Sequence, residues 1–246
     1  SGADSAKYSQ GGSDLQPLGV AARAGQEITI YAQGIPEGGS LSVCATQFNG
    51  EVSAWKASMG TLVNGRNVLV LPEITGRKDV GHGGSLYFTY SGANPEGISL
   101  HVRQATDIPV LDVSGWYNMN ETVRGAAIGA YVAELEAYVS AIKVSDANKT
   151  SEYRNVTEIA TPTVLLSLPA LAALNGLGTG NRGAKIAQLT NSVLAWEDLL
   201  HICKTTQGID KTYGENDMQS RQNIRCMTMF TGAFMYAAGS HVGIGY

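Results

Sequence analysis

The residues of this sequence best suited to metal binding or proton transfer are four scattered histidines: His82, His101, His201 and His241. None is followed by glutamate, so the sequence has no H-E-x-x-H motif, in which two histidines one helical turn apart bind zinc and the glutamate acts as base. It also has no G-x-S-x-G motif, so no serine nucleophile is indicated. The sequence therefore predicts no catalytic residue and no metal ligand within this chain.

A glycine-rich segment, GTGNRG (178–183), matches the pattern G-x-G-x-x-G. A dinucleotide site needs a strand that runs directly into the first glycine and an acid about 20 residues further on. The preceding LPALAALN has a helix-favouring composition, and the acids near that distance, Glu197 and Asp198, fall inside a predicted helix. We interpret the segment as a connection between helices, and Glu197/Asp198, like Glu134/Glu136, as solvated helix faces. The alternative, a dinucleotide-binding enzyme, predicts NAD binding.

The composition is that of a folded protein. Of the 246 residues, 43% are hydrophobic and 15% are charged, and the net charge of −4 comes without a basic block, which excludes an electrostatic nucleic-acid site. The apolar run 164–174 contains Pro169 and is too short to span a bilayer. Three cysteines are too few for a disulfide framework, and whether Cys203 and Cys226 pair stays open.

Residues 16–107 show the period-two pattern of short strands separated by Gly, Pro and Asn turns. In EITIYAQG, Ile28 and Ile30 share one face, and SLSVCATQF, RNVLVLPEI, SLYFTYSG and GISLHVRQ repeat the alternation. The pattern predicts a β-sandwich. Trp55 and Trp116 lie at strand ends or turns, where a ring can stack on a sugar, and we interpret both as core residues. Residues 1–15 are small and polar and are interpreted as a linker or tail.

From residue 108 the pattern becomes helical. Asn120 is a predicted N-cap, followed by apolar residues at 3.6-residue spacing as far as Ile142. Ser167 is predicted to cap a second, short helix with a proline in its first turn, and a third helix is predicted over 184–205. NIRCMTMFTG alternates and predicts a strand. The fold class is therefore α+β.

Several ordered segments together resemble the enhancin-like M60 metallopeptidases. QPLGV, GQEITIYAQG, GRNVLVLPEI, GGSLYFTYSG and DIPVLDVSG resemble the N-terminal part of these proteins, in which a β-sandwich precedes the peptidase domain. LTNSVLAWEDLL and FMYAAGSHVGIGY resemble the first part of the peptidase domain. The resemblance covers roughly residues 16–246. It implies an accessory sandwich over 16–107 and the start of an α+β metallopeptidase domain over 108–246.

The resemblance also implies a chemistry and a substrate. The family is similar to gluzincins, in which zinc bound by H-E-x-x-H and a downstream glutamate activates a water. Its members are implied to be secreted or cell-surface enzymes that cleave O-glycosylated proteins such as mucins. The resemblance stops short of H-E-x-x-H, so zinc is implied for a complete enzyme and not for this chain. We expect an N-terminal portion that is inactive alone. A naturally short, zinc-free relative is one alternative, and a non-catalytic glycan- or protein-binding module is another.

The segment FMYAAGSHVGIGY carries the candidate binding residues. Many zinc peptidases hold their substrate as an extra strand along a sheet edge, where main-chain hydrogen bonds provide binding. Glycines such as Gly239 and Gly243 let another backbone approach closely, and His241 and Tyr246 offer donors or stacking faces. With Tyr236, these residues are expected to line the substrate cleft of the complete enzyme. The alternative is an internal core strand in which glycine serves packing.

Overall fold

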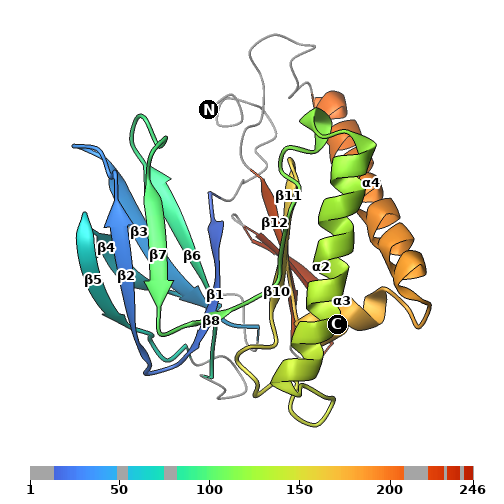
Figure 1. Cartoon of the computed structure of the whole chain (residues 1–246), viewed down its shortest axis with the longest axis horizontal. Helices are drawn as coiled ribbons and strands as arrows, with labels where there is room; N and C mark the ends of the chain where they lie inside the picture. The colour runs from blue at the N-terminus through green and yellow to red at the C-terminus, as the bar shows by residue number, and fades with distance from the viewer. Residues whose placement is uncertain are drawn as a thin grey trace.

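The computed structural model describes residues 14–48, 55–74, 82–207, 221–229, 232–238 and 241–245. Within them, a three-stranded sheet, a five-stranded sheet, a six-stranded sheet and a layer of helices stack in that order. Figure 1 shows the sandwich of the first two sheets on one side, the helices on the other and β10 to β12 between them. The predicted α+β class is confirmed.

The sandwich consists of two antiparallel sheets. The five-stranded sheet has the order β4-β3-β6-β1-β8, with β1 (Gln16–Arg23), β3 (Ser40–Thr46), β4 (Lys56–Leu62), β6 (Gly83–Ser91) and β8 (Thr106–Asp107). The three-stranded sheet has the order β5-β2-β7, with β2 (Glu27–Gln33), β5 (Gly65–Val70) and β7 (Ser99–Arg103). Alternate residues face inward, and Ile28, Ile30, Leu41 and Val43 are buried between the sheets, as the alternation predicted.

The third sheet is mixed and has the order β13-β14-β12-β11-β10-β9. Its strands are β9 (Val110–Asp112), β10 (Thr157–Ala160), β11 (Val164–Leu168), β12 (Gln222–Met227), β13 (Met235–Ala238) and β14 (His241–Gly245). The pairs β9/β10, β11/β12 and β12/β14 are parallel, whereas β10/β11 and β13/β14 are antiparallel. β8 pairs with β1 and β9 pairs with β10, so the chain passes between the sheets at residues 108–109.

Helices cover the face of the six-stranded sheet that is turned away from the sandwich (Figure 1). They are η2 (Trp116–Asn118), α2 (Glu121–Ile142), α3 (Ala170–Gly176) and α4 (Arg182–Gln207). The Asn120 side chain accepts a 2.9 Å hydrogen bond from the main-chain N–H of Val123, which confirms the predicted cap. The buried stripe of α2, which includes Ile128 and Leu135, packs on Ile159 of β10.

The predicted cap at Ser167 is wrong. Antiparallel pairing with β10 continues through Leu168, so Ser167 is still in a strand and its hydroxyl points toward the sandwich. There it donates a 2.7 Å hydrogen bond to the buried carboxyl of Glu158. Pro169 takes the N-cap position of α3, with no side-chain cap. In sequence, a serine shortly before a proline and a helical pattern resembles a helix cap. In the structure, pairing with β10 determines where the Ser167 hydroxyl points.

The solvated-face interpretation is also wrong for Glu197, while the interpretation of GTGNRG is confirmed. That segment joins α3 to α4. Glu197 is only 2% exposed, and its carboxylate accepts hydrogen bonds from Thr161 Oγ1 at 2.5 Å, Thr163 Oγ1 at 2.6 Å and Tyr117 Oη at 2.9 Å. Hydroxyls from the β10–β11 turn and from η2 take the place of water. Asp198 is exposed, as expected.

Three smaller questions from the sequence are answered by the structure. Trp55 and Trp116 are 4% and 3% exposed, which confirms them as core residues. Cys203 and Cys226 are free thiols and do not form a disulfide here. Among the helices of the described ranges, none combines the length and apolarity needed to cross a membrane.

Candidate functional site

The hairpin β13–β14 places a free strand edge at one side of the six-stranded sheet. The Gly245 N–H donates a 2.8 Å hydrogen bond to the Phe234 carbonyl, and Tyr236 lies opposite Gly243. In an antiparallel ladder, main-chain groups point alternately toward and away from the partner strand. The groups of Tyr236 therefore face β14, whereas those of Met235 and Ala237 point away from it. This edge is open to an added strand within the described part of the sheet.

Gly243 is required by a side chain of this hairpin. A Cβ built on Gly243 would lie 2.2 Å from Cε1 of Tyr236, because the tyrosine ring crosses directly over the glycine. The ring ends at a hydroxyl that donates to the Met227 sulfur at 2.9 Å and lies 2.8 Å from Nε2 of His241. The hairpin thus turns Tyr236 and His241 toward the sandwich.

His241 is a buried, neutral imidazole. It is 3% exposed, and its ring centroid lies 4.4 Å from that of Trp55 and 5.3 Å from that of Tyr236. Burial, together with the positive charges of Arg225 and Lys56, lowers the pKa of His241 to about 4. The ring is therefore uncharged near neutral pH and is held between two aromatic rings.

Arg225 on β12 is a fully buried cation beside this histidine. Its guanidinium carbon lies 5.0 Å from the ring centroid of Phe48, 4.9 Å from that of Trp55 and 5.6 Å from that of Tyr87. Nη1 donates to the Tyr87 hydroxyl at 3.3 Å, whereas Nε and Nη2 have no hydrogen-bond partner among the described residues. Aromatic faces therefore provide much of the environment that water would otherwise provide for this charge.

Glu158 on β10 is the buried acid of the same layer. Tyr87 donates to its Oε1, and Ser167 donates to its Oε2 at 2.7 Å. Burial raises the pKa of Glu158 to about 7, although the charge of Arg225 and the hydroxyl donors act in the opposite direction. Burial, and then the nearby Glu158 carboxyl, also raise the pKa of Tyr87 well above its ordinary value. We call Tyr87, Glu158, Ser167 and Arg225 the polar seam, because they join the sandwich to the six-stranded sheet.

An apolar cavity lies on the other face of that sheet. Its volume is about 340 Å³, and its lining includes Trp196 of α4, Cys226 of β12 and Ile244 of β14. Burial raises the pKa of the Cys226 thiol to about 11, so the thiol stays protonated near neutral pH and is a poor nucleophile. The cavity is therefore suited to apolar contact and not to acid–base chemistry.

The structure brings together three of the five candidate residues from the sequence. Tyr236 contacts both His241 and Gly243, while Gly239 and Tyr246 lie outside the described residues. Contact with substrate stays a prediction for all five. Met235 and Ala237, which present the free edge, were not singled out in the sequence, although alternation from Tyr236 could have indicated them.

Sequence reasoning also missed the polar seam. Glu158 and Arg225 stand in short apolar strands, TEIA and NIRCM. A charged residue inside such a strand is a usable signal, because a charge is rarely buried without a partner. The partner itself was not visible, since Tyr87 lies 71 residues before Glu158.

The described residues of this chain do not assemble a zinc centre. The described ranges contain no group of three or more His, Cys, Asp or Glu side chains that could hold a metal ion. His241 Nε2 lies against the Tyr236 hydroxyl and the ring packs on Trp55, so it has no free approach for a metal. We therefore assign no zinc ligand and derive no catalytic step through zinc in this chain.

Comparison with known proteins identifies the fold. No family model and no curated protein matches the chain. Among solved structures, the ZmpB metallopeptidase from Clostridium perfringens matches with a TM-score of 0.69 and 24% identity over 95% of this chain and 44% of that one. The M60 catalytic domain of ZmpC from the same organism, in complex with the sialyl T antigen, matches with a TM-score of 0.69 and 22% identity over 96% and 44%.

A solved structure with lower sequence identity has the same fold. A metallopeptidase from Bacteroides thetaiotaomicron matches with a TM-score of 0.63 and 14% identity, over 100% of this chain and 35% of that one. The chain thus spans less than half the length of these solved structures. At such identities the likeness establishes the fold alone. The chain has the fold of M60 metallopeptidase domains, the enhancin-like fold that its sequence segments resemble.

Proposed function

We propose that this chain is the N-terminal part of a secreted or cell-surface zinc metallopeptidase of the M60 type, which cleaves O-glycosylated proteins such as mucins. The observation that carries the proposal is the shared fold, which extends over 95–96% of this chain in three Clostridium perfringens metallopeptidases. The ordered sequence segments that resemble the same family support it. The complex of one of these domains with the sialyl T antigen is consistent with a glycosylated substrate.

The zinc centre belongs, on this proposal, to sequence that this chain does not contain. We expect the purified chain to leave mucin intact with or without added zinc, and a longer chain that continues into H-E-x-x-H and a downstream glutamate to hydrolyse it. Gel electrophoresis of the mucin, with and without a chelator, measures both. Chelator-sensitive hydrolysis by residues 1–246 alone, or a coding sequence that continues without the motif, would refute the proposal.

The part that this chain plays is to present an edge for the substrate backbone. The main-chain groups of Met235 and Ala237 point away from β14, so an extended peptide can pair with β13 whatever its side chains are. Such pairing suits a substrate whose side chains carry glycans, because the contacts do not depend on the peptide sequence. Tyr236 and His241 support the edge from the sandwich side of the hairpin.

The edge can be tested without the zinc centre. An O-glycosylated peptide added to the labelled chain is expected to shift the amide NMR signals of Met235 and Ala237 more than those of strands in the sandwich. Ala237→Pro removes an outward N–H and leaves the ladder to β14 intact, whereas Ala237→Val keeps that N–H. One main-chain hydrogen bond contributes about 1 kcal/mol, so we expect roughly fivefold weaker binding for the proline variant alone. Equal peptide affinity of the two variants would show that the substrate does not pair with β13.

A further inference from the structure

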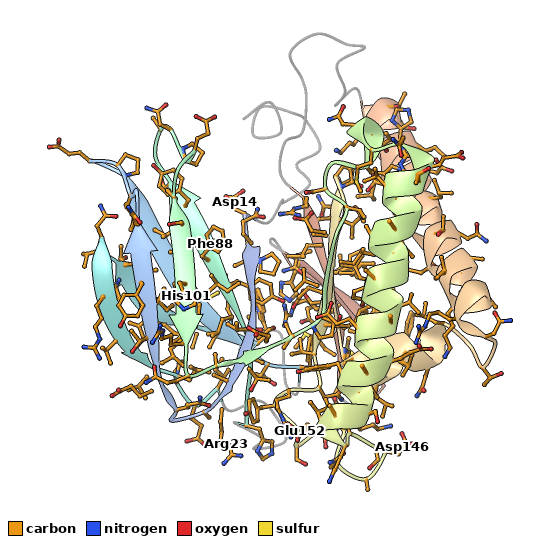
Figure 2. The ribbon with its side chains drawn as sticks, viewed as in Figure 1. Asp14, Arg23, Phe88, His101, Asp146 and Glu152 are labelled. Carbon is orange, nitrogen blue, oxygen red and sulfur yellow. The ribbon has the colours of Figure 1, made fainter. Side chains whose placement is uncertain are left out.

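The outer face of the three-stranded sheet lies at the opposite end of the molecule from the helices. It is formed by β5, β2 and β7, whose inward residues pack on the five-stranded sheet. Figure 2 shows His101 on β7 of the sandwich. This face therefore takes no part in the polar seam or in the β13 edge, and it is open to solvent.

Strand register places three different functional groups in one row across this face. Tyr31 of β2 is opposite His101 of β7 on one side and Arg66 of β5 on the other. Directly opposite residues of an antiparallel pair point to the same face of a sheet. Tyr31 is 41% exposed, and Arg66 and His101 are exposed as well. The row thus presents a guanidinium, a phenol ring and an imidazole to solvent.

A second arginine, Arg103, packs against this row from the neighbouring pair of outward positions. Arg103 is opposite Thr29, one outward position along β2 from Tyr31. Its guanidinium carbon lies 5.9 Å from the Tyr31 ring centroid, and its Nε donates to Nε2 of His101 at 3.5 Å. The arginine side chain is therefore held against the tyrosine ring before any ligand arrives, which lowers the entropy lost on binding.

A depression of about 450 Å³ adjoins this row. Tyr31, Gln33, Ser99 and His101 are among the residues that line it. Gln33 and Ser99 are opposite one another and exposed, and they offer an amide and a hydroxyl at the end of the row. The volume lies in the range of roughly 300–1,000 Å³ that is usual for sites that bind small molecules. The depression is open, and it combines apolar surface with these polar groups, as suits a sugar ring that carries hydroxyls.

The charge of this face differs from that of the whole chain. The net charge of the sequence is −4, yet the outer face of the three-stranded sheet carries the two cations Arg66 and Arg103. Of the outward positions on β2, β5 and β7, all of them described, Glu27 is the one carboxylate, and it lies four residues from Tyr31, or about 13 Å along the strand. Two cations are too few for a nucleic-acid backbone, which needs a longer positive surface. They suit a single carboxylate.

We propose that this face binds a saccharide that carries a carboxylate. The Tyr31 ring packs against the apolar face of the sugar ring, Arg66 and Arg103 pair with the carboxylate, and Gln33 and Ser99 bond to hydroxyls. Uronic acids and sialic acids share this chemistry. A site on the outer sheet requires no peptidase activity, so the proposal stands or fails apart from the function proposed above.

The test uses the full chain and small defined sugars. Methyl glycosides of glucuronic acid and of N-acetylneuraminic acid are titrated separately, with methyl glucoside as the neutral counterpart, and amide NMR shifts report the site and the Kd. We expect an acidic sugar to shift amides of β2 and β7 with a Kd at least tenfold lower than that of methyl glucoside. The acidic sugar that binds with the lower Kd identifies whether the site prefers a uronic acid or a sialic acid. Equal binding of the neutral sugar, or shifts elsewhere on the chain, would overturn the proposal.

Variants separate the two parts of the site. Arg66→Gln and Arg103→Gln are each expected to weaken the acidic sugar at least fivefold and to leave methyl glucoside unchanged, because they remove only a charge that faces the carboxylate. Tyr31→Ala is expected to weaken both sugars, while Tyr31→Phe retains the ring and the binding. Val70→Ala, an exposed change on the same face, is the matched control with unchanged Kd. Unchanged acidic-sugar affinity in both arginine variants would refute the assignment, and thermal midpoints show that each variant is folded.

Discussion

The charge state of Glu158 leads to a specific expectation for stability. In the folded protein this carboxyl is fully buried between the sandwich and the six-stranded sheet, and its pKa is raised from 4.5 to about 7. A folded-state pKa above the unfolded value means that the protonated acid is the form that folding favours. Its contribution to stability is therefore complete below pH 4.5 and is lost as the pH rises through 7. Glu158→Gln, which cannot ionise, removes this dependence.

The size of the effect follows from the shift. One pKa unit corresponds to 1.36 kcal/mol, so two units between pH 5 and the folded-state pKa give a change of about 3 kcal/mol in the free energy of unfolding. At pH 5 the variant and the parent differ only by the rearranged hydrogen bonds of Tyr87 and Ser167. At pH 8 the parent contains a buried carboxylate and the variant does not. The variant is therefore expected to gain about 3 kcal/mol relative to the parent over this range.

Urea unfolding of both proteins at pH 5, 6, 7 and 8 measures the difference directly. Other titrating groups are common to both chains and cancel in it. Glu152→Gln is the control, since the Arg154 guanidinium lowers the pKa of the Glu152 carboxyl. Its contribution is lost only as the pH falls below 4.5, so its difference from the parent is expected to be flat from pH 5 to 8. A pH-independent difference for Glu158→Gln would show that the polar seam does not hold a protonated acid.

Three further expectations follow from the same structure. His241→Phe is expected to show a pH dependence of opposite sign, because a folded-state pKa of about 4 gives stability that is present above pH 6.5 and lost as the pH falls; urea unfolding from pH 4 to 7 measures it. Glu197→Ala takes the carboxylate acceptor away from two buried hydroxyls, those of Thr161 and Thr163, and should lower stability by about 3 kcal/mol, against less than about 0.5 for the exposed Asp198→Ala, as read from chemical denaturation. Gly243→Ala should cost about 1–3 kcal/mol, and a Tyr236→Ala background should remove most of that cost; additive losses would contradict the contact.

Local signals in the sequence were sufficient to predict most of the strands and helices. The alternation around Ile28 and Leu41 and the cap at Asn120 are properties of neighbouring residues, and the structure confirms them. The predictions for Ser167 and Glu197 were wrong for one shared reason. Ser167 was predicted to cap a helix and Glu197 to face water, but tertiary partners turn both polar groups toward the protein interior. Pattern and propensity do not contain that information.

The candidate site shows the same division. Tyr236, His241 and Gly243 lie in one hairpin, so their proximity could be predicted from sequence distance alone. The direction of the His241 ring could not, because Trp55, on which it packs, comes from the sandwich. The lowered pKa of that ring depends on its own burial and then on Arg225, and the burial of both residues is a product of tertiary packing.

The polar seam has a consequence for how such proteins can be recombined. Tyr87 comes from the sandwich, whereas Glu158, Ser167 and Arg225 come from the six-stranded sheet. A sandwich grafted from a relative without a tyrosine at this position would leave a buried acid short of a donor and a buried guanidinium short of a ring. Chimeras must therefore carry the tyrosine across with the graft. The two halves therefore have to be exchanged as a matched pair.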